Sequence, residues 1–203
     1  MKLNLKPDYT YETILTTYFE DKTPNAAPMG IIFIDEKVVE ISPFLSTQTY
    51  KNIERDGCAV INFIHDLKIF FTCTFNVKKP KLPLNFFEKS LKVNAPRLKS
   101  ALAHIEVETR EIKKNIDRSK IIGEIITWDI ENVPFLPLNR GYNLVLESII
   151  HTTRILAFWN DSKKIKPLMD LFNRYQKLIE KVAPTGDYIE IMKQLRSIIE
   201  KGN

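Results

Sequence analysis

The sequence predicts a mainly β fold of the α+β class, in which an antiparallel barrel in residues 1–137 is followed by a C-terminal helical subdomain in residues 138–203. Two observations predict it. Several segments rich in β-branched and aromatic residues follow one another with short connections and no regular strand-helix-strand alternation, which favours an antiparallel barrel. After Pro134 and Pro137 the composition changes, and apolar residues recur at helical spacing.

Small residues begin the second predicted strand. Residues 11–18 alternate and predict the first strand, and the polar residues 20–24 predict a turn. The second strand, residues 25–34, is apolar on both faces. Its first half has little side-chain bulk and contains a proline, so a ligand can approach this backbone closely; the alternative is a bulged edge strand with small residues for packing. The residues concerned are Asn25, Ala26, Ala27, Pro28, Met29 and Gly30.

A short polar helix is predicted after the third strand, residues 37–41. Ser46 or Thr47 can cap this helix, which runs to about residue 56, and Gly57 can end it. The apolar face of the helix consists of Tyr50 and Ile53.

The start of this helix gathers hydroxyl, amide and ammonium groups where the backbone N–H groups of the first turn lack partners. We expect this helix start to be exposed. Such a combination suits a phosphate group, and the alternative is an ordinary capped surface helix. The candidate residues are Thr47, Thr49, Lys51 and Asn52.

Asn62 is the only amide side chain in the next predicted strand, residues 58–64, which is otherwise strongly apolar. A buried asparagine needs hydrogen-bond partners. Asn62 therefore either satisfies neighbouring backbone groups or faces a ligand, and the sequence leaves both roles open.

The middle of the chain is expected to contain a strand at residues 69–75, a basic loop at residues 78–83 and helical spacing over residues 86–102. Pro96 argues against one continuous helix there, so we expect a break near residues 94 and 95. Two long strands that pair with each other are predicted at residues 104–113 and 120–130.

Three helices are predicted in the C-terminal subdomain, at residues 141–158, 162–182 and 188–199, with Thr185 or Asp187 capping the last one. His151 and Arg154 lie three positions apart on the first of these helices. They can offer donors to an anion, or they can simply hydrogen-bond locally.

Composition and motifs exclude several function classes. The net charge of +5 favours anionic ligands, but no aromatic and basic interleaving indicates nucleic acid. The three histidines and two cysteines lack metal-ligand spacing, so no metal site is expected. No motif for nucleophilic catalysis, nucleotide hydrolysis or Rossmann dinucleotide binding occurs, and no catalytic side chain is predicted. No apolar run is long enough to span a bilayer, so we expect a cytoplasmic protein without a membrane partner.

Taken together, the order of these segments resembles the flavin-reductase-like split-barrel superfamily, whose members bind flavin mononucleotide (FMN). The shared features are the strand beginning Asn-Ala-Ala-Pro-Met-Gly, the Thr-x-x-Asn helix and the Val-x-Asn strand. More closely, residues 11–31, 49–53 and 146–155 resemble an uncharacterised, largely archaeal family of unknown function. The resemblance covers most of residues 9–158.

The resemblance implies an antiparallel split β-barrel of the FMN-binding type, with the isoalloxazine ring of FMN against residues 25–30. The ribityl chain and phosphate would lie near Thr47, Thr49, Lys51 and Asn52, and Asn62 would lie at the pocket edge. It also implies a homodimer with flavin at the subunit interface. The resemblance does not identify the electron donor.

The function expected from the resemblance is that of an FMN-binding oxidoreductase with an unknown substrate. In such a protein the cofactor carries the redox chemistry, so no catalytic constellation of side chains is required. The alternatives are a flavin-binding carrier or sensor without turnover, a basic protein that binds anions or nucleic acid on the same barrel, or the same fold with a deazaflavin or haem.

Overall fold

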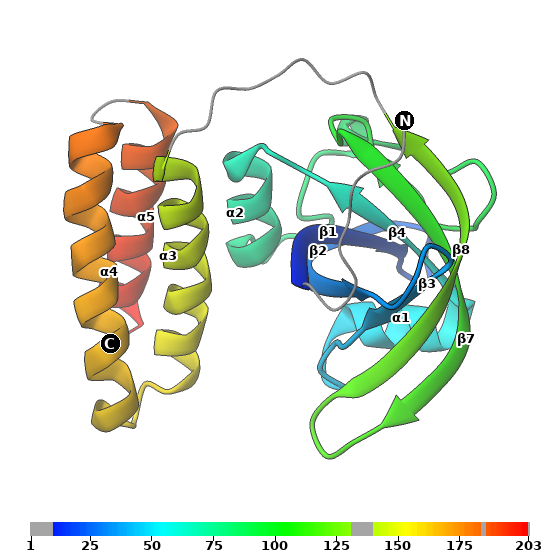
Figure 1. Cartoon of the computed structure of the whole chain (residues 1–203), viewed down its shortest axis with the longest axis horizontal. Helices are drawn as coiled ribbons and strands as arrows, with labels where there is room; N and C mark the ends of the chain where they lie inside the picture. Colours follow the sequence, from blue (N-terminus) through cyan, green and yellow to red (C-terminus); the bar gives the residue numbers. More distant parts are fainter. Residues whose placement is uncertain (1–9, 131–139, 184–185, 203) are drawn as a thin grey trace. The chain divides into compact units, whose positions relative to one another are not determined.

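The computed structural model describes residues 10–130, 140–183 and 186–202. The chain forms two compact units, residues 1–133 and 134–203, and each unit is described by itself (Figure 1). The predicted domain boundary after residue 137 and the predicted cap Thr185 lie outside the described residues. That boundary therefore stays a prediction.

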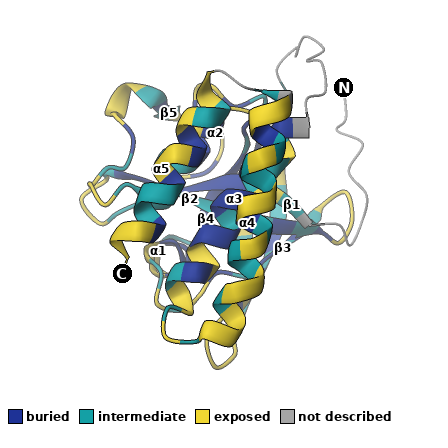
Figure 2. Ribbon diagram, turned by 90° about the vertical axis from the view of Figure 1, so that its left-hand side faces the viewer, coloured by how far each residue is buried: buried dark blue, intermediate teal, exposed yellow. Residues whose placement is uncertain are grey.

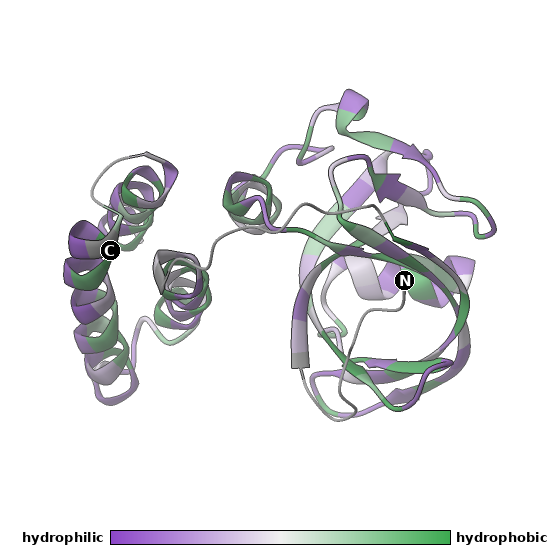
Figure 3. Cartoon of the chain, turned by 45° about the horizontal axis from the view of Figure 1, so that its top comes forward, coloured by the Kyte–Doolittle hydropathy of each residue, from purple (hydrophilic) through white to green (hydrophobic). Residues whose placement is uncertain are grey.

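The first unit contains a closed antiparallel barrel with the strand order β1-β2-β3-β8-β7-β4. Figure 3 shows these strands as a ring. The prediction of an antiparallel barrel is confirmed, and every strand end lies within one residue of its predicted position. The strands are β1 (Thr10–Tyr18), β2 (Pro24–Phe33), β3 (Val38–Ile41), β4 (Cys58–Phe63), β7 (Ala103–Lys114) and β8 (Ser119–Ile130).

The barrel core is built by the apolar residues that alternate along the strands, because successive side chains of a strand point to opposite faces of the sheet. Helix α1 (Gln48–Asp56) contributes Tyr50 and Ile53 to the same core and contacts β1 and β2 (Figure 1). The predicted apolar face of this helix is therefore confirmed. The strand residues of the core are Leu15, Ile31, Phe33, Val39, Ile41, Ala59, Ile61, Ile105, Val107 and Ile121.

The strand predicted at residues 69–75 is wrong, because this segment forms helix α2 (Leu67–Phe75). Asp66 caps the helix by accepting hydrogen bonds from the N–H groups of Lys68 and Ile69, at 2.8 and 3.3 Å. The aromatic and β-branched composition misled the prediction, since a good N-cap and burial against β2 outweigh weak local strand propensity.

The helix predicted at residues 86–102 is also wrong. The segment contains a short 3-10 turn, η1 (Leu84–Phe86), and two paired strands, β5 (Phe87–Lys89) and β6 (Pro96–Leu98). Arg97 on β6 forms ion pairs with Glu88 on β5 and with Asp129 on β8. These contacts join residues distant in sequence, so the local spacing of apolar residues did not reveal them.

The second unit packs three helices together, α3 (Arg140–Ala157), α4 (Ser162–Val182) and α5 (Asp187–Lys201), as predicted. Figure 2 shows exposed, intermediate and buried residues alternating along these helices. Asp187 does not cap α5: it is the first helical residue, and the cap position is Gly186, whose φ is 82°. Fully buried residues of this unit include Val145, Ile149, Ile155, Phe172, Ile179 and Leu195. None of the helices in the described ranges is long and apolar enough to cross a membrane.

Candidate functional site

The start of α1 has the predicted cap. The Thr47 hydroxyl accepts a hydrogen bond from the Tyr50 N–H at 3.3 Å and donates one to the Phe44 carbonyl at 2.7 Å. At the other end, Gly57 adopts a left-handed conformation with φ of 66° and donates its N–H to the Ile53 carbonyl. Both end signals are therefore confirmed, since a hydroxyl suits the N-cap and a glycine suits a positive φ.

The expectation that this helix start is exposed is wrong for Thr49 and Asn52, which are 2% and 0% exposed. Asn52 donates through Nδ2 to the Thr17 hydroxyl at 2.9 Å and accepts from the Gln48 side chain at 2.7 Å. The Thr49 hydroxyl accepts from Asn25 Nδ2 at 3.2 Å. Thr49 and Asn52 share the inward face of α1 with Ile53, because residues three and four positions apart lie on one side of a helix.

Thr47 and Lys51 remain available at the surface of the helix start. Thr47 is half-buried and Lys51 is exposed. The first turn of α1 carries no acidic residue, and the acids further along, Glu54 and Asp56, pair with Lys114 and Arg55. Lys114 beside it holds the pKa of the Glu54 carboxyl below its usual value. The field at the helix start is therefore positive, since the helix dipole adds to Lys51.

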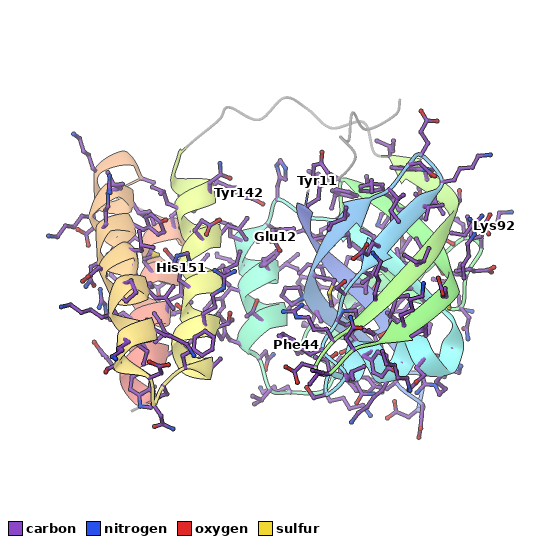
Figure 4. All side chains as sticks on the ribbon, turned by 60° about the horizontal axis from the view of Figure 1, so that its bottom comes forward. Tyr11, Glu12, Phe44, Lys92, Tyr142 and His151 are labelled. Atoms are coloured by element: carbon purple, nitrogen blue, oxygen red, sulfur yellow. The ribbon has the colours of Figure 1, made fainter. Side chains whose placement is uncertain are left out.

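Arg118 adds a further cation beside the cap. Its guanidinium stacks over the Phe44 ring, 3.7 Å from the ring centre, and donates to the Ser42 carbonyl at 2.9 Å. Phe44 is 46% exposed and labelled in Figure 4. The sequence did not identify Arg118, because a bridge between residues 44 and 118 brings it to this place.

The small-residue half of β2 has an unpaired edge. β2 pairs with β1 from Pro24 to Ile32, but it pairs with β3 only from Ile31 to Phe33. Among the strands that the structure describes, none pairs with residues 24–30 on the β3 side. Residues 27–30 are half-buried, whereas Asn25 and Ala26 are buried.

The alternation of the strand decides which backbone groups face this edge. The Ile34 N–H donates to the Val38 carbonyl at 2.9 Å, so even-numbered residues direct their N–H and C=O groups toward the β3 side. The main-chain groups that point to the unpaired edge are therefore the N–H groups of Ala26 and Gly30 and the carbonyls of Ala26, Pro28 and Gly30. Ala26 is fully buried, whereas Pro28 and Gly30 are half-buried, so a flat ligand can approach the main-chain groups of Pro28 and Gly30.

Asn62 is fully buried and its amide is occupied within the barrel. Nδ2 donates to the carbonyls of Ile14 and Val60 and to the Thr16 hydroxyl, at 2.9, 3.1 and 3.0 Å. Oδ1 accepts from the Leu98 N–H at 2.8 Å. Of the two roles that the sequence left open, this geometry favours the structural one, and its predicted place at the edge of a flavin pocket stays a prediction.

His151 and Arg154 lie on α3 in the second unit and differ in exposure. His151, labelled in Figure 4, is 6% exposed, with Nδ1 2.7 Å from the Glu147 carbonyl and its ring edge-on to the Tyr175 ring. Arg154 is exposed in the last turn of α3. His151 thus makes a local hydrogen bond, which was the alternative to anion binding. A joint role of His151 and Arg154 toward an anion stays a prediction.

Comparison with protein families gives matches along most of the chain. Residues 11–132 match the N-terminal domain of a protein of unknown function, DUF447, and residues 139–197 match the second domain of that protein. Among solved structures, an FMN-bound DUF447 protein from Methanosarcina mazei is 26% identical, with a TM-score of 0.73 over 96% of this chain and 95% of that one.

More distant structures share the barrel fold. A flavoredoxin from Methanosarcina acetivorans is 18% identical, with a TM-score of 0.56 over 67% of this chain and 78% of that one. The 2-nitrobenzoate 2-nitroreductase of Pseudomonas fluorescens is 21% identical, with a TM-score of 0.52 over 63% of this chain and 67% of that one. The flavin-reductase-like split-barrel fold that the resemblance implied is therefore confirmed.

Proposed function

Because this chain belongs to the DUF447 family, we propose that it is an FMN-binding flavoprotein that works as an oxidoreductase. The observation that carries the proposal is the convergence of the unpaired half of β2 with the capped start of α1, in a chain similar along nearly its whole length to an FMN-bound protein. FMN would supply the hydride or electron transfer, which requires no acid or base from the protein.

The residues present fit the two ends of FMN. The main-chain groups of Pro28 and Gly30 that face the unpaired edge, two carbonyls and the Gly30 N–H, offer acceptors and a donor to the edge of an isoalloxazine ring, which is flat and needs a surface without bulk. A doubly charged phosphate suits the start of α1, where Thr47 and Lys51 lie beside unpaired helical N–H groups.

We also propose that FMN lies at the interface of a homodimer. Phe44 and Ile116 are 46% and 96% exposed. Their segments are joined, because the Leu45 N–H donates to the Asp117 carbonyl at 2.9 Å. Neighbouring exposed apolar side chains form a surface that a second subunit can cover, and these adjoin the cap of α1. A Phe44→Asp variant should sediment as a monomer and lose flavin affinity, whereas a dimeric variant with unchanged affinity would contradict the proposal.

The visible absorption spectrum of the purified protein, before and after incubation with FMN, tests cofactor binding. A flavin spectrum retained through gel filtration supports the proposal, and a colourless protein after reconstitution overturns it. A deazaflavin or haem would give a different spectrum. Stopped-flow reduction by nicotinamide donors then tests turnover: a bound flavin that no donor reduces would favour a carrier or sensor.

A further inference from the structure

Thr17 lies where β1, β2 and α1 meet, and it is 1% exposed. Its hydroxyl accepts two hydrogen bonds, from Asn25 Nδ2 at 3.1 Å and from Asn52 Nδ2 at 2.9 Å. Asn25 is its cross-strand neighbour on β2, whereas Asn52 lies 35 residues away on α1. A single hydroxyl oxygen thus joins the strand that carries the small residues to the helix that carries the polar start.

The hydrogen bonds continue from Thr17 into the first turn of α1. Asn25 also donates to Thr49, and Asn52 accepts from Gln48, the first residue of the helix. At the far end of α1, Arg55 donates to the Tyr18 carbonyl at 2.7 Å, so α1 is fixed to β1 near its middle, through Asn52, and in its last turn. The first turn of α1, where the phosphate is proposed to bind, is joined to β2 by the Asn25–Thr49 hydrogen bond, and Thr17 holds both Asn25 and Asn52 in place.

We infer that Thr17 is a positioning residue, which sets the affinity for the phosphate of FMN without touching the cofactor. This inference rests on the proposed function. Replacing the hydroxyl by a methyl group leaves the buried amide of Asn52 without its acceptor and removes one of the two acceptors of the Asn25 amide. The Asn52 side chain must then move or bind a water molecule to regain a hydrogen bond. The first turn of α1 then shifts against β2. Phosphate binding by N–H groups depends on their alignment, so this shift weakens it.

The ring end of the site does not depend on the Thr17 side chain. Residues 27–30 are held by the backbone ladder between β1 and β2, which is independent of side-chain hydroxyls. Loss of the hydroxyl should therefore weaken binding of the phosphate end of the cofactor and leave binding of its ring end unchanged. FMN, which has the phosphate, should bind more weakly, whereas riboflavin, which lacks it, should bind almost as before.

The experiment measures dissociation constants of FMN and riboflavin by quenching of flavin fluorescence, for the full chain and for Thr17→Val, Thr17→Cys and Thr17→Ser. We expect Thr17→Val to lower the preference for FMN over riboflavin about tenfold, the equivalent of roughly one buried hydrogen bond. Thr17→Cys keeps a weak acceptor and should lower the preference for FMN over riboflavin about threefold. Thr17→Ser keeps the hydroxyl and should restore the preference.

The matched control is Thr16→Val. Thr16 is the adjacent residue on β1 and is fully buried. Its hydroxyl donates toward the Val60 and Pro96 carbonyls and accepts from Asn62 Nδ2, and none of these partners lies on α1. The Thr16→Val variant should have a lower free energy of unfolding than the parent and the same preference for FMN over riboflavin. A folded Thr17→Val or Thr17→Cys with the parental preference would overturn the positioning role while the proposed function stands. A parent protein that binds neither flavin would overturn both.

Discussion

The side-chain amide of Asn25, at the start of β2, lies 3.2 Å from the hydroxyl of Thr49, in the first turn of α1. Thr49 and Asn52 are buried, so they hold the helix to the barrel. A Thr49→Ala, Asn52→Ala double variant should therefore lower the free energy of unfolding by roughly 3 kcal/mol, because buried partners are left unsatisfied. Urea unfolding measures this.

The control for that variant is Lys51→Ala, on the exposed side of the same turn. We expect its free energy of unfolding to stay within about 0.5 kcal/mol of the parent, as for most surface substitutions. A double variant as stable as Lys51→Ala would show that the buried hydrogen bonds contribute nothing to the attachment of α1.

The sequence was sufficient for the elements whose signals are local. The alternation of β1, β7 and β8, the hydroxyl cap at Thr47 and the glycine at position 57 each act within a few residues. These signals also located the candidate site, because the small residues of β2 and the polar start of α1 are visible as patterns.

The features that depend on distant partners were not predictable in this way. Whether Asn52 faces solvent or Thr17 depends on the barrel against which α1 packs. Residues 86–102 show helical spacing, yet Glu106 and Arg97 hold part of this segment in non-helical structure through contacts with distant segments. The role of Arg118 beside Phe44 likewise follows from a pairing that joins positions 74 residues apart.

The unpaired edge of β2 makes a specific prediction for proline substitutions. Gly30→Pro removes an N–H that faces away from β1, so the protein should fold with its free energy of unfolding within about 1 kcal/mol of the parent. Because that N–H is a candidate donor to the flavin ring, affinity for both FMN and riboflavin should fall. Flavin titration and urea unfolding on the same samples measure the two effects.

The comparison variant is Ala27→Pro. Ala27 is half-buried, like Gly30, but its N–H faces Leu15 on β1. Loss of that ladder hydrogen bond in the paired direction should lower the free energy of unfolding by roughly 3 kcal/mol or more. Equal stability of the two proline variants would mean that the N–H directions assigned along β2 are reversed or irrelevant.

Glu106 provides a test of how residues 90–93 are held on the barrel. Its carboxylate is fully buried and accepts from the N–H groups of Leu91, Lys92 and Val93, at 2.6, 2.6 and 3.0 Å (Lys92 is labelled in Figure 4). Glu106→Gln turns one acceptor oxygen into a donor that faces other donors. The free energy of unfolding should fall by roughly 3 kcal/mol.

Hydrogen exchange should locate the effect of Glu106→Gln in residues 90–93, with faster exchange there than in the parent. Glu108→Gln is the control, since Glu108 lies on the same strand and is exposed. Unchanged exchange in residues 90–93 would mean that β5 and β6 hold the segment without the carboxylate.

Cys73 should make the protein less stable in alkali. Burial raises the pKa of its thiol to about 12, whereas an unfolded thiol has a pKa of about 8.5. Between these values the unfolded chain has lost the proton and the folded chain keeps it, so the free energy of unfolding falls as pH rises, by about 1.4 kcal/mol per pH unit. Below about pH 8 the stabilisation from this pKa difference is complete.

Urea unfolding at about pH 8 and pH 10 should show a loss of unfolding free energy roughly 2 kcal/mol larger in the parent than in Cys73→Ala, which lacks the titrating group. Identical losses in the two proteins would show that the thiol titrates alike in both states, which contradicts its burial on α2, a helix that contacts β2.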